Sequence, residues 1–373
     1  MGRFLVLFPL FLWIAGCSTP PAPLVYDRTA TPSRSVSHTK SYIQPQPESL
    51  DELGFEALIH MLAQRVEVNW GDTKSSGTKE YVKYSNDYRT RVMVNFDKRK
   101  VRVETLDRKD LRRAIVVTLL TPDDPEQVDL FSASDIVLGK EPVLYKQVLD
   151  NYGNPIRWEW RAGNYADYLM QHNLSRKSTS KGTVYAVDFD MVHQQQSAGH
   201  YQYASLVRKY SQKYRVDESL IYGIIRTESS FNPFAVSWAN AYGLMQVVPR
   251  TAGHDVFQRL KKRRDKPTRN YLFQPANNID VGTGYLHILD TVYLKGITNP
   301  LSRRYAIISA YNGGAGNVLR TFDKNRTRAV DKINRLEPSQ VYWALTRRHP
   351  RQESRRYLEK VTAAEKDFHQ GRI

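Results

Sequence analysis

The chain has 373 residues, of which 41% are hydrophobic and 25% are charged, so most of it is expected to fold into packed cores rather than remain disordered. Its one cysteine excludes a disulfide framework and cysteine-rich metal sites. The net charge of +17 is uneven, because residues 1–197 carry a net +1 and residues 198–373 a net +16. Any basic interaction surface is therefore expected in the C-terminal half.

The N-terminus has the pattern of an export signal. Arg3 precedes an almost wholly apolar run, residues 4–14, which is shorter than the roughly 18–20 residues needed to span a membrane. The small residues that follow end in Cys17, and this arrangement resembles the signal of bacterial lipoproteins, in which the cysteine carries the lipid. An ordinary secretory signal with an incidental cysteine is the alternative. Ser18 stands where an aspartate would retain a lipoprotein at the inner membrane, which favours the periplasmic face of the outer membrane.

Composition divides the rest of the chain into a tether and two domains. After a signal peptide of residues 1–16, residues 17–48 are rich in Pro, Ser and Thr and are expected to form a flexible lipid-anchored tether. Residues 49–192 mix helical and strand patterns, which predicts an α+β domain whose role the residues do not reveal. Residues 198–373 show helical periods separated by Gly, Pro and Asn, which predicts an all-α domain.

The α+β region contains several elements with clear periodicity. The patterns predict helices over residues 50–66 and 111–119, a β-hairpin over 92–103 and a strand over 185–191. Trp70 and the aromatic stretch Tyr81–Tyr84 have two interpretations, a sugar-binding face or an ordinary edge of the core, and the second is favoured.

Glu228 is the first candidate catalytic residue. Asp217 is a good helix N-cap, and the apolar residues that follow it form one helical stripe: Leu220, Ile221, Ile224 and Ile225. At 100° per residue Glu228 falls in the middle of this stripe, where burial would raise the pKa of its carboxyl and suit it to act as a general acid. Alternatively, the helix ends at Arg226 and Glu228 lies in solvent or in an ion pair.

The segments after Glu228 contain uncharged hydrogen-bonding groups and aromatic rings between apolar runs. No other carboxylate occurs between Ser219 and His254. This composition suits sugar hydroxyls, N-acetyl groups and pyranose faces. The segments concerned are 229–233, Ser237, 243–246, 278–286 and 310–314.

This set of motifs resembles that of the lysozyme-like lytic transglycosylases, and the N-terminal half resembles the membrane-bound C type of that family. The matching motifs are Glu228-Ser229, Gly243-Leu244-Met245-Gln246, Ala310-Tyr311-Asn312-Gly313-Gly314 and Arg356-Tyr357-Leu358. The resemblance implies a goose-type-lysozyme-like all-α catalytic domain with Glu228 as the sole acid/base. It also implies that the following residues bind substrate: Ser237, Gln246, Tyr311, Asn312 and Tyr357.

The implied reaction is cleavage of the MurNAc–GlcNAc β-1,4 bond of peptidoglycan, with formation of 1,6-anhydro-MurNAc ends. Because most glycosidases need two carboxylates, a single carboxylate requires the substrate to supply the second group. No cofactor or metal is expected, and a monomer is favoured. The alternatives are a lysozyme-type hydrolase, a non-enzymatic murein-binding lipoprotein and a nucleic-acid binder, of which the last conflicts with the export signal.

One segment departs from the family pattern. The basic stretch of residues 261–269 lies between two motif segments and contains four consecutive basic residues, Lys261 to Arg264. We expect this stretch to contact the anionic peptide stems of peptidoglycan, although it could instead be a solvated surface.

Overall fold

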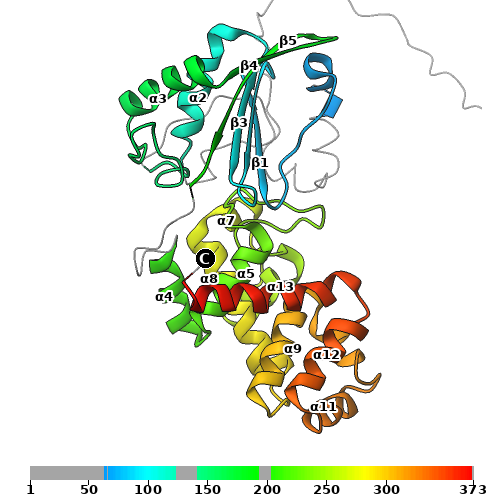
Figure 1. The fold of residues 1–373 in the computed structure, drawn as a ribbon. Helices are drawn as coiled ribbons and strands as arrows, with labels where there is room; N and C mark the ends of the chain where they lie inside the picture. The colour runs from blue at the N-terminus through cyan, green and yellow to red at the C-terminus, as the bar shows by residue number, and fades with distance from the viewer. Residues whose placement is uncertain (1–62, 65, 123–140, 193–202, 372–373) are drawn as a thin grey trace, which may run out of the picture. The chain divides into compact units, whose positions relative to one another are not determined.

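The computed structural model describes residues 63–64, 66–122, 141–192 and 203–371 (Figure 1). All of these residues belong to one compact unit, residues 46–373. They form a five-stranded sheet with two helices, followed along the chain by an all-helical domain, which confirms the predicted fold class.

The expected export signal, most of the predicted N-terminal helix and the expected lipid attachment site at Cys17 lie outside the described residues. The end of that helix is described, and residues 66–70 are helical, a few residues beyond the predicted end. Within the described ranges, no helix is long and apolar enough to cross a membrane.

The sheet has the strand order β1-β2-β3-β5-β4, and every neighbouring pair is antiparallel. Its strands are β1 (Glu80–Ser85), β2 (Thr90–Asn95), β3 (Lys100–Thr105), β4 (Leu174–Thr179) and β5 (Gly182–Asp190). The predicted hairpin is β2–β3, in which Val92 lies opposite Val103. The strand predicted near residue 185 is β5.

Both faces of the sheet are covered in its central part. Helices α2 (Arg108–Leu119) and α3 (Glu159–His172) pack on one face, where buried Leu111 and Ile115 meet the hairpin valines. A second cluster on the sheet contains Trp70 and Tyr84, which are 6% and 1% exposed. These aromatic residues are therefore core residues, as the favoured interpretation predicted, and they form no sugar-binding face.

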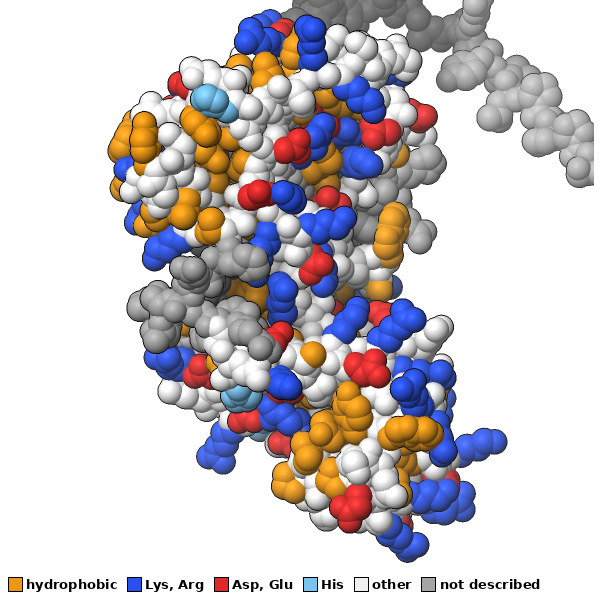
Figure 2. Space-filling model, in the orientation of Figure 1, with side chains coloured by type: hydrophobic (Ala, Val, Ile, Leu, Met, Phe, Trp, Pro, Cys, Tyr) orange, Lys and Arg blue, Asp and Glu red, His pale blue; other side chains and the backbone are white. Residues whose placement is uncertain are grey.

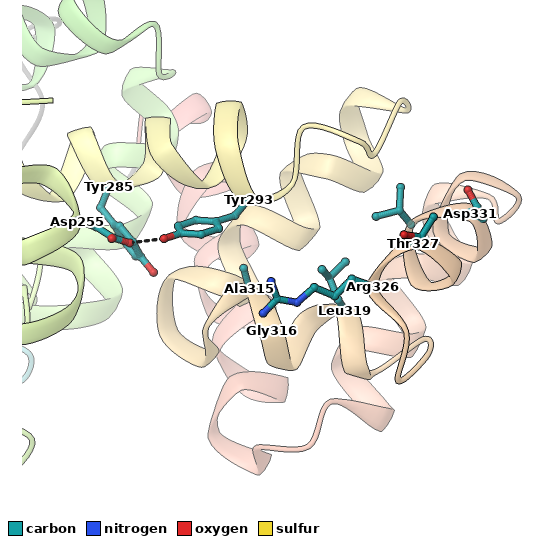
Figure 3. Close-up of a pocket in the computed structure, with 10 residues that line it drawn as sticks. Asp255, Tyr285, Tyr293, Ala315, Gly316, Leu319, Arg326, Thr327 and Asp331 are labelled. Atoms are coloured by element: carbon teal, nitrogen blue, oxygen red, sulfur yellow. Dashed lines mark hydrogen bonds between the residues drawn. The ribbon is translucent and has the colours of Figure 1, made fainter. Parts of the chain in front are cut away.

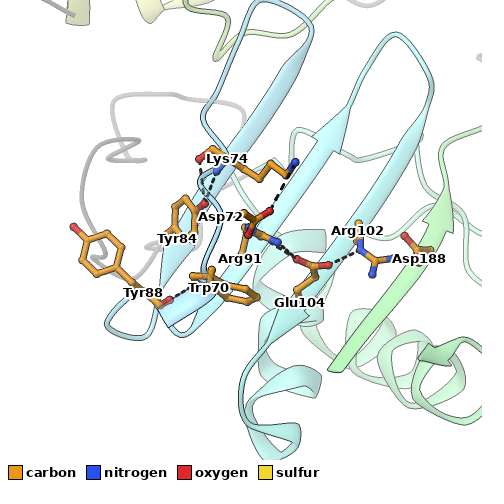
Figure 4. A network of polar contacts seen from close by, with 9 residues as sticks. All are labelled: Trp70, Asp72, Lys74, Tyr84, Tyr88, Arg91, Arg102, Glu104 and Asp188. Atoms are coloured by element: carbon orange, nitrogen blue, oxygen red, sulfur yellow. Dashed lines mark hydrogen bonds and ion pairs between the residues drawn. The ribbon is translucent and has the colours of Figure 1, made fainter. Parts of the chain in front are cut away.

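A buried ion pair connects β2 to β3 (Figure 4). Arg91 Nη2 donates to Glu104 Oε2 at 2.6 Å, and the Arg91 guanidinium also lies 4.4 Å from the ring centroid of Trp70. Arg102 donates to the second oxygen of Glu104 at 2.6 Å, so both carboxylate oxygens have partners. The free-energy cost of burying the Glu104 carboxylate is offset by the hydrogen bonds from Arg91 and Arg102.

The helical domain contains ten α-helices and two π-helical turns within the described residues. They are α4 (Ala204–Tyr214), α5 (Glu218–Ser229), η2 (Pro249–Gly253), α6 (His254–Arg259), α7 (Arg269–Phe273), α8 (Pro275–Ile288), η3 (Leu289–Tyr293), α9 (Pro300–Gly313), α10 (Ala315–Arg320), α11 (Arg326–Asn334), α12 (Pro338–Arg348) and α13 (Gln352–His369).

Helix α5 packs along α13, the last helix of the domain (Figure 1). Asp217 occupies its N-cap position as predicted, but the Asp217 side chain makes no capping hydrogen bond. Instead, the Asp217 carboxylate accepts a hydrogen bond from Arg304 of α9, which ties the start of α5 to that helix.

Candidate active site

Glu228 lies in the last turn of helix α5. The helix continues to Ser229, so the alternative in which it ends at Arg226 is wrong. The apolar stripe before Glu228 is fully buried, with Ile221, Ile224 and Ile225 each 0% exposed. Glu228 itself is partly buried at the point where this stripe reaches the surface of the domain. Helical periodicity in a buried segment has therefore placed a carboxyl at the edge of the core.

A hydrogen bond links Glu228 to the last helix. The Tyr357 hydroxyl of α13 donates to Glu228 Oε1 at 2.7 Å, and Tyr357 is 4% exposed. Burial raises the pKa of Glu228 to about 7, against the lowering effect of the Tyr357 hydrogen bond. A carboxyl with this pKa can be protonated or ionised near neutral pH, as a residue that first donates and then accepts a proton requires.

The Gly243–Gln246 loop lies beside the end of α5 because two buried side chains hold it. Ser229 Oγ donates to the carbonyl of Leu244 at 2.8 Å. Asn278 of α8, which is 0% exposed, accepts from the Met245 amide at 2.8 Å. Gly243 has φ +72°, and a Cβ there would lie 2.4 Å from Asn278 Nδ2, so glycine is required both by the conformation and by the close approach.

Tyr311 and Asn312 come from the end of helix α9. The Tyr311 hydroxyl donates to the carbonyl of Met245 at 2.8 Å, and burial together with the nearby Glu228 raises the pKa of Tyr311 well above its ordinary value. Asn312 Oδ1 accepts from Ser354 Oγ at 2.6 Å. These bonds connect α9 to the Gly243–Gln246 loop on one side and to α13 on the other.

Ser237 and Gln246 are held mainly by the backbone of their own loops. Ser237 Oγ accepts from the Ala241 amide at 3.1 Å. Gln246 Nε2 donates to the carbonyls of Ala235 and Gly243 at 3.1 and 3.0 Å, while Gln246 Oε1 is buried and has no hydrogen-bond partner in the described part of the chain. The amide oxygen of Gln246 is thus a buried acceptor whose hydrogen-bonding capacity is unused among the described residues.

Two charged residues of the site were missed by the sequence analysis. Glu353, at the start of α13, accepts from Asn312 Nδ2 at 3.5 Å, and its negative charge raises the pKa of Glu228. Lys79, just before β1, has the opposite effect on that pKa. Both lie more than a hundred residues from Glu228 along the chain, and no local spacing could connect them to it.

A cavity of about 470 Å³ lies between α6, η3, α10 and α11 (Figure 3). Its walls include Tyr285, Tyr293 and the backbone at Gly316, and Tyr293 donates to Asp255 Oδ2 at 2.8 Å. The Tyr285 ring centroid is 5.7 Å from that of Tyr311. The cavity therefore adjoins the group of residues around Glu228 through these two rings.

The basic stretch 261–269 has internal partners that the sequence did not indicate. Lys261 is paired with buried Asp280 of α8, which also accepts from Lys213 Nζ at 2.8 Å. Arg263 Nε donates to Asp265 Oδ1 at 2.9 Å. Lys261 is therefore engaged within the domain, and fewer charges of this stretch than the sequence suggested are free to contact substrate.

Comparison with known proteins accounts for both parts of the chain. The family model "Membrane-bound lytic murein transglycosylase C, N-terminal domain" matches residues 48–202, and the model "Transglycosylase SLT domain" matches residues 205–334. A membrane-bound lytic murein transglycosylase C of Serratia proteamaculans is 51% identical over 85% of this chain and 90% of that relative. The chain belongs to this lytic murein transglycosylase family. The corresponding protein of Yersinia enterocolitica is 48% identical over 90% of this chain and 95% of its own length.

A solved structure is also similar to part of the chain. The 70 kDa soluble lytic transglycosylase SLT70 from Escherichia coli is 27% identical, covers 46% of this chain and 25% of that chain, and has a TM-score of 0.36. The family membership rests on the two domain models and on the long matches to the type C relatives. Among the described residues, no group of three or more His, Cys, Asp or Glu side chains is placed to hold a metal ion.

Proposed function

We propose that this transglycosylase cleaves the MurNAc–GlcNAc bond of peptidoglycan with Glu228 as both acid and base. The proposal is carried by one arrangement: a carboxyl at the edge of a buried helix face, with its pKa raised to about 7 and a tyrosine hydroxyl bonded to it. The family membership of the chain supports the choice of peptidoglycan as substrate.

In the first step, protonated Glu228 gives its proton to the oxygen that bridges the two sugars, and the glycosidic bond breaks. The N-acetyl group of the muramic acid shields the anomeric carbon during this step. Glu228 is now ionised and accepts the proton of the muramic acid 6-hydroxyl, whose oxygen attacks the anomeric carbon. The product is a 1,6-anhydro ring, no water is consumed, and Glu228 is protonated again.

The surrounding residues favour this sequence of proton transfers. The Tyr357 hydroxyl stabilises Glu228 while it is ionised, and the other predicted residues offer uncharged contacts to sugar substituents: Ser237, Gln246, Tyr311 and Asn312. The cavity lined by Tyr285 and Tyr293 provides aromatic walls for further pyranose rings of the strand.

Mass spectrometry of the products from purified murein tests the proposal. Wild-type protein should release fragments with 1,6-anhydro-MurNAc ends, and folded Glu228→Gln protein should bind murein but lose at least about 10²-fold in rate. Reducing MurNAc ends would show that the protein is a lysozyme-type hydrolase. Near-wild-type turnover by Glu228→Gln would remove Glu228 from the mechanism.

The same proposal includes a lipid anchor on Cys17 at the periplasmic face of the outer membrane, with the domain acting as a monomer. The support is the sequence of residues 1–18 and the name of the relatives, membrane-bound lytic murein transglycosylase C. Cys17→Ser should move the protein from the membrane fraction to the soluble periplasm without loss of activity on soluble fragments. Continued sedimentation with membranes after a salt wash would contradict the anchor.

A further inference from the structure

The β-sheet contacts the turn that immediately follows Glu228. Ser230 Oγ donates to Asp97 Oδ1 at 2.8 Å, and Asp97 lies in the β2–β3 turn. Asn232 Nδ2 donates to the carbonyl of Thr78 at 3.2 Å. The rings of Tyr81 in β1 and Phe234 pack with their centroids 4.6 Å apart. Three kinds of contact thus connect the sheet to residues 230–234.

This turn has a conformation that needs support. Ser230 ends helix α5 in the left-handed region with φ 50°, and Phe231 follows with φ 68°. Residues with a Cβ adopt this region at a cost, and two in succession are rare. The bond from Ser230 Oγ to Asp97 supplies a partner for a buried hydroxyl, since Ser230 is 4% exposed. Glu228 lies two residues before this turn, in the last turn of helix α5.

Asp97 also holds a lysine near the site. Lys79 Nζ donates to Asp97 Oδ1 at 3.0 Å, and the Phe96 amide donates to the carbonyl of Lys79 at 2.9 Å, so the lysine is held by side chain and backbone. Lys79 Nζ and Ser230 Oγ share the same oxygen of Asp97. The Lys79 ammonium is therefore fixed on the sheet side of the turn after Glu228.

We propose that Lys79 and Asp97 of the sheet are positioning residues for Glu228. Asp97 holds the left-handed turn that ends α5, and it directs the Lys79 ammonium so that this charge stabilises Glu228 in the ionised state between the two proton transfers. This inference rests on the proposed role of Glu228. It assigns a part in the reaction itself to the N-terminal domain, whose role the residues alone do not reveal.

The charged groups around Glu228 allow the sign of the effect to be worked out. From α13, Glu353 raises the pKa of Glu228 and the Tyr357 hydroxyl lowers it, while Lys79 lowers it from the sheet side. Asp97 is the partner of Lys79. Burial alone would raise the pKa of Asp97, but this pKa is lowered by the hydrogen bonds from Lys79 and Ser230 and by the charge of nearby Arg226. Loss of Lys79 should therefore raise the pKa of Glu228 and make its ionised form less stable.

The experiment measures initial rates of anhydro-product release from murein between pH 5 and 9 with the full chain. Lys79→Met should move the basic limb of the rate profile to higher pH by about 0.5–1 unit, whereas Lys79→Arg, which keeps the positive charge, should have the wild-type profile. Asp97→Ala should lower the maximal rate about tenfold, because it removes both the turn contact and the partner of Lys79. Lys100→Met breaks an exposed ion pair with Asp190 on the same sheet and serves as the matched control.

The outcomes separate this inference from the proposed function. If Glu228→Gln is inactive while folded Lys79→Met and Asp97→Ala keep the wild-type rate and pH profile, the positioning role is wrong and the role of Glu228 stands. If Glu228→Gln is active, both fail. Should Asp97→Ala prove unfolded by circular dichroism, the comparison of Lys79→Met with Lys79→Arg still decides, because an unchanged profile in both overturns the inference.

Discussion

The Tyr357 hydroxyl donates a hydrogen bond to Glu228 Oε1 at 2.7 Å, across 129 residues of sequence. The bond opposes the effect of burial, because a hydrogen bond to the ionised carboxylate lowers its pKa whereas burial raises it. The balance leaves the pKa of Glu228 at about 7. Tyr357 therefore helps to set the pH dependence of the reaction through its effect on the pKa of Glu228.

Tyr357→Phe should shift this balance. Without the donor, the pKa of Glu228 rises, so the basic limb of kcat/KM should move to higher pH by about one unit, and the maximal rate should fall about tenfold. Initial rates on murein from pH 5 to 9 test this. Tyr305→Phe makes the same chemical change elsewhere in the helical domain and should behave as wild type. An unshifted profile would show that the hydrogen bond does not control Glu228.

The raised pKa of Glu228 also predicts a pH-dependent stability. Its folded-state pKa of about 7 exceeds the ordinary value of 4.5, so protonated Glu228 is favoured in the folded protein over the unfolded chain. The contribution of this group to the free energy of unfolding is fully present below pH 4.5 and is lost as the pH rises to about 7. The cost of ionising Glu228 in the folded state is on the order of 3 kcal/mol. Glu228→Gln, which cannot ionise, should gain stability relative to wild type between pH 4 and pH 8. Equal differences in the free energy of unfolding at both pH values would contradict this.

Local periodicity was sufficient to predict helix α5 and the β2–β3 hairpin, because each depends on residues within one or two turns. For Glu228 it left two positions open, and the structure places this residue partly buried in the last turn of α5. Periodicity could not predict Tyr357 as the partner of Glu228, because the family motif implied only that Tyr357 binds substrate; the hydrogen bond to Glu228 is seen in the structure. Glu353 and Lys79 were missed because contacts between distant segments leave no spacing signal. Among the aromatic residues, the burial of Trp70 agrees with the favoured interpretation, whereas Trp238, directly after Ser237, is 67% exposed.

Strand β1 illustrates why some elements escaped prediction. Its four central residues are all buried, including Lys83, so the alternation of apolar and polar residues that marks a half-exposed strand is missing. The Tyr81 and Tyr84 side chains belong to different clusters of the core. Sequence alone identified an aromatic stretch there but could not show that both sides of the strand are covered.

The internal pairing of Lys261 predicts a stability effect in a segment that the sequence assigned to substrate binding. Lys261, Lys213 and Tyr214 all contact Asp280, and although burial alone would raise the pKa of Asp280, the hydrogen bonds from the two lysines lower it. Lys261→Met should therefore reduce the free energy of unfolding by about 1–3 kcal/mol. The adjacent Lys262→Met should change it by less than about 0.5 kcal/mol. Equal effects in urea denaturation would argue against a structural role for Lys261.

The basic surface of the helical domain must then be sought elsewhere. Figure 2 shows Lys and Arg side chains gathered along the edge of the domain formed by α11 and α12. Arg335 at the end of α11 and Arg347 and Arg348 in the last turn of α12 are exposed, and the Arg348 guanidinium lies 5.1 Å from the ring centroid of exposed Trp343. Exposed charges act over about 8–10 Å at physiological salt, so they can attract the carboxylates of peptide stems without shaping the site around Glu228.

Replacing Arg335, Arg347 and Arg348 with Ser should therefore weaken binding to intact murein severalfold at low salt, and the difference should vanish near 0.5 M salt because exposed charges are screened. Cleavage of peptide-free glycan strands should be unchanged, since those strands lack the stem carboxylates. A Lys262→Ser, Arg264→Ser variant removes two charges from the stretch 261–269 and shows whether that segment shares the effect. An equal loss on both substrates would mean that the arginines support the fold of α12, and the electrostatic explanation would be wrong.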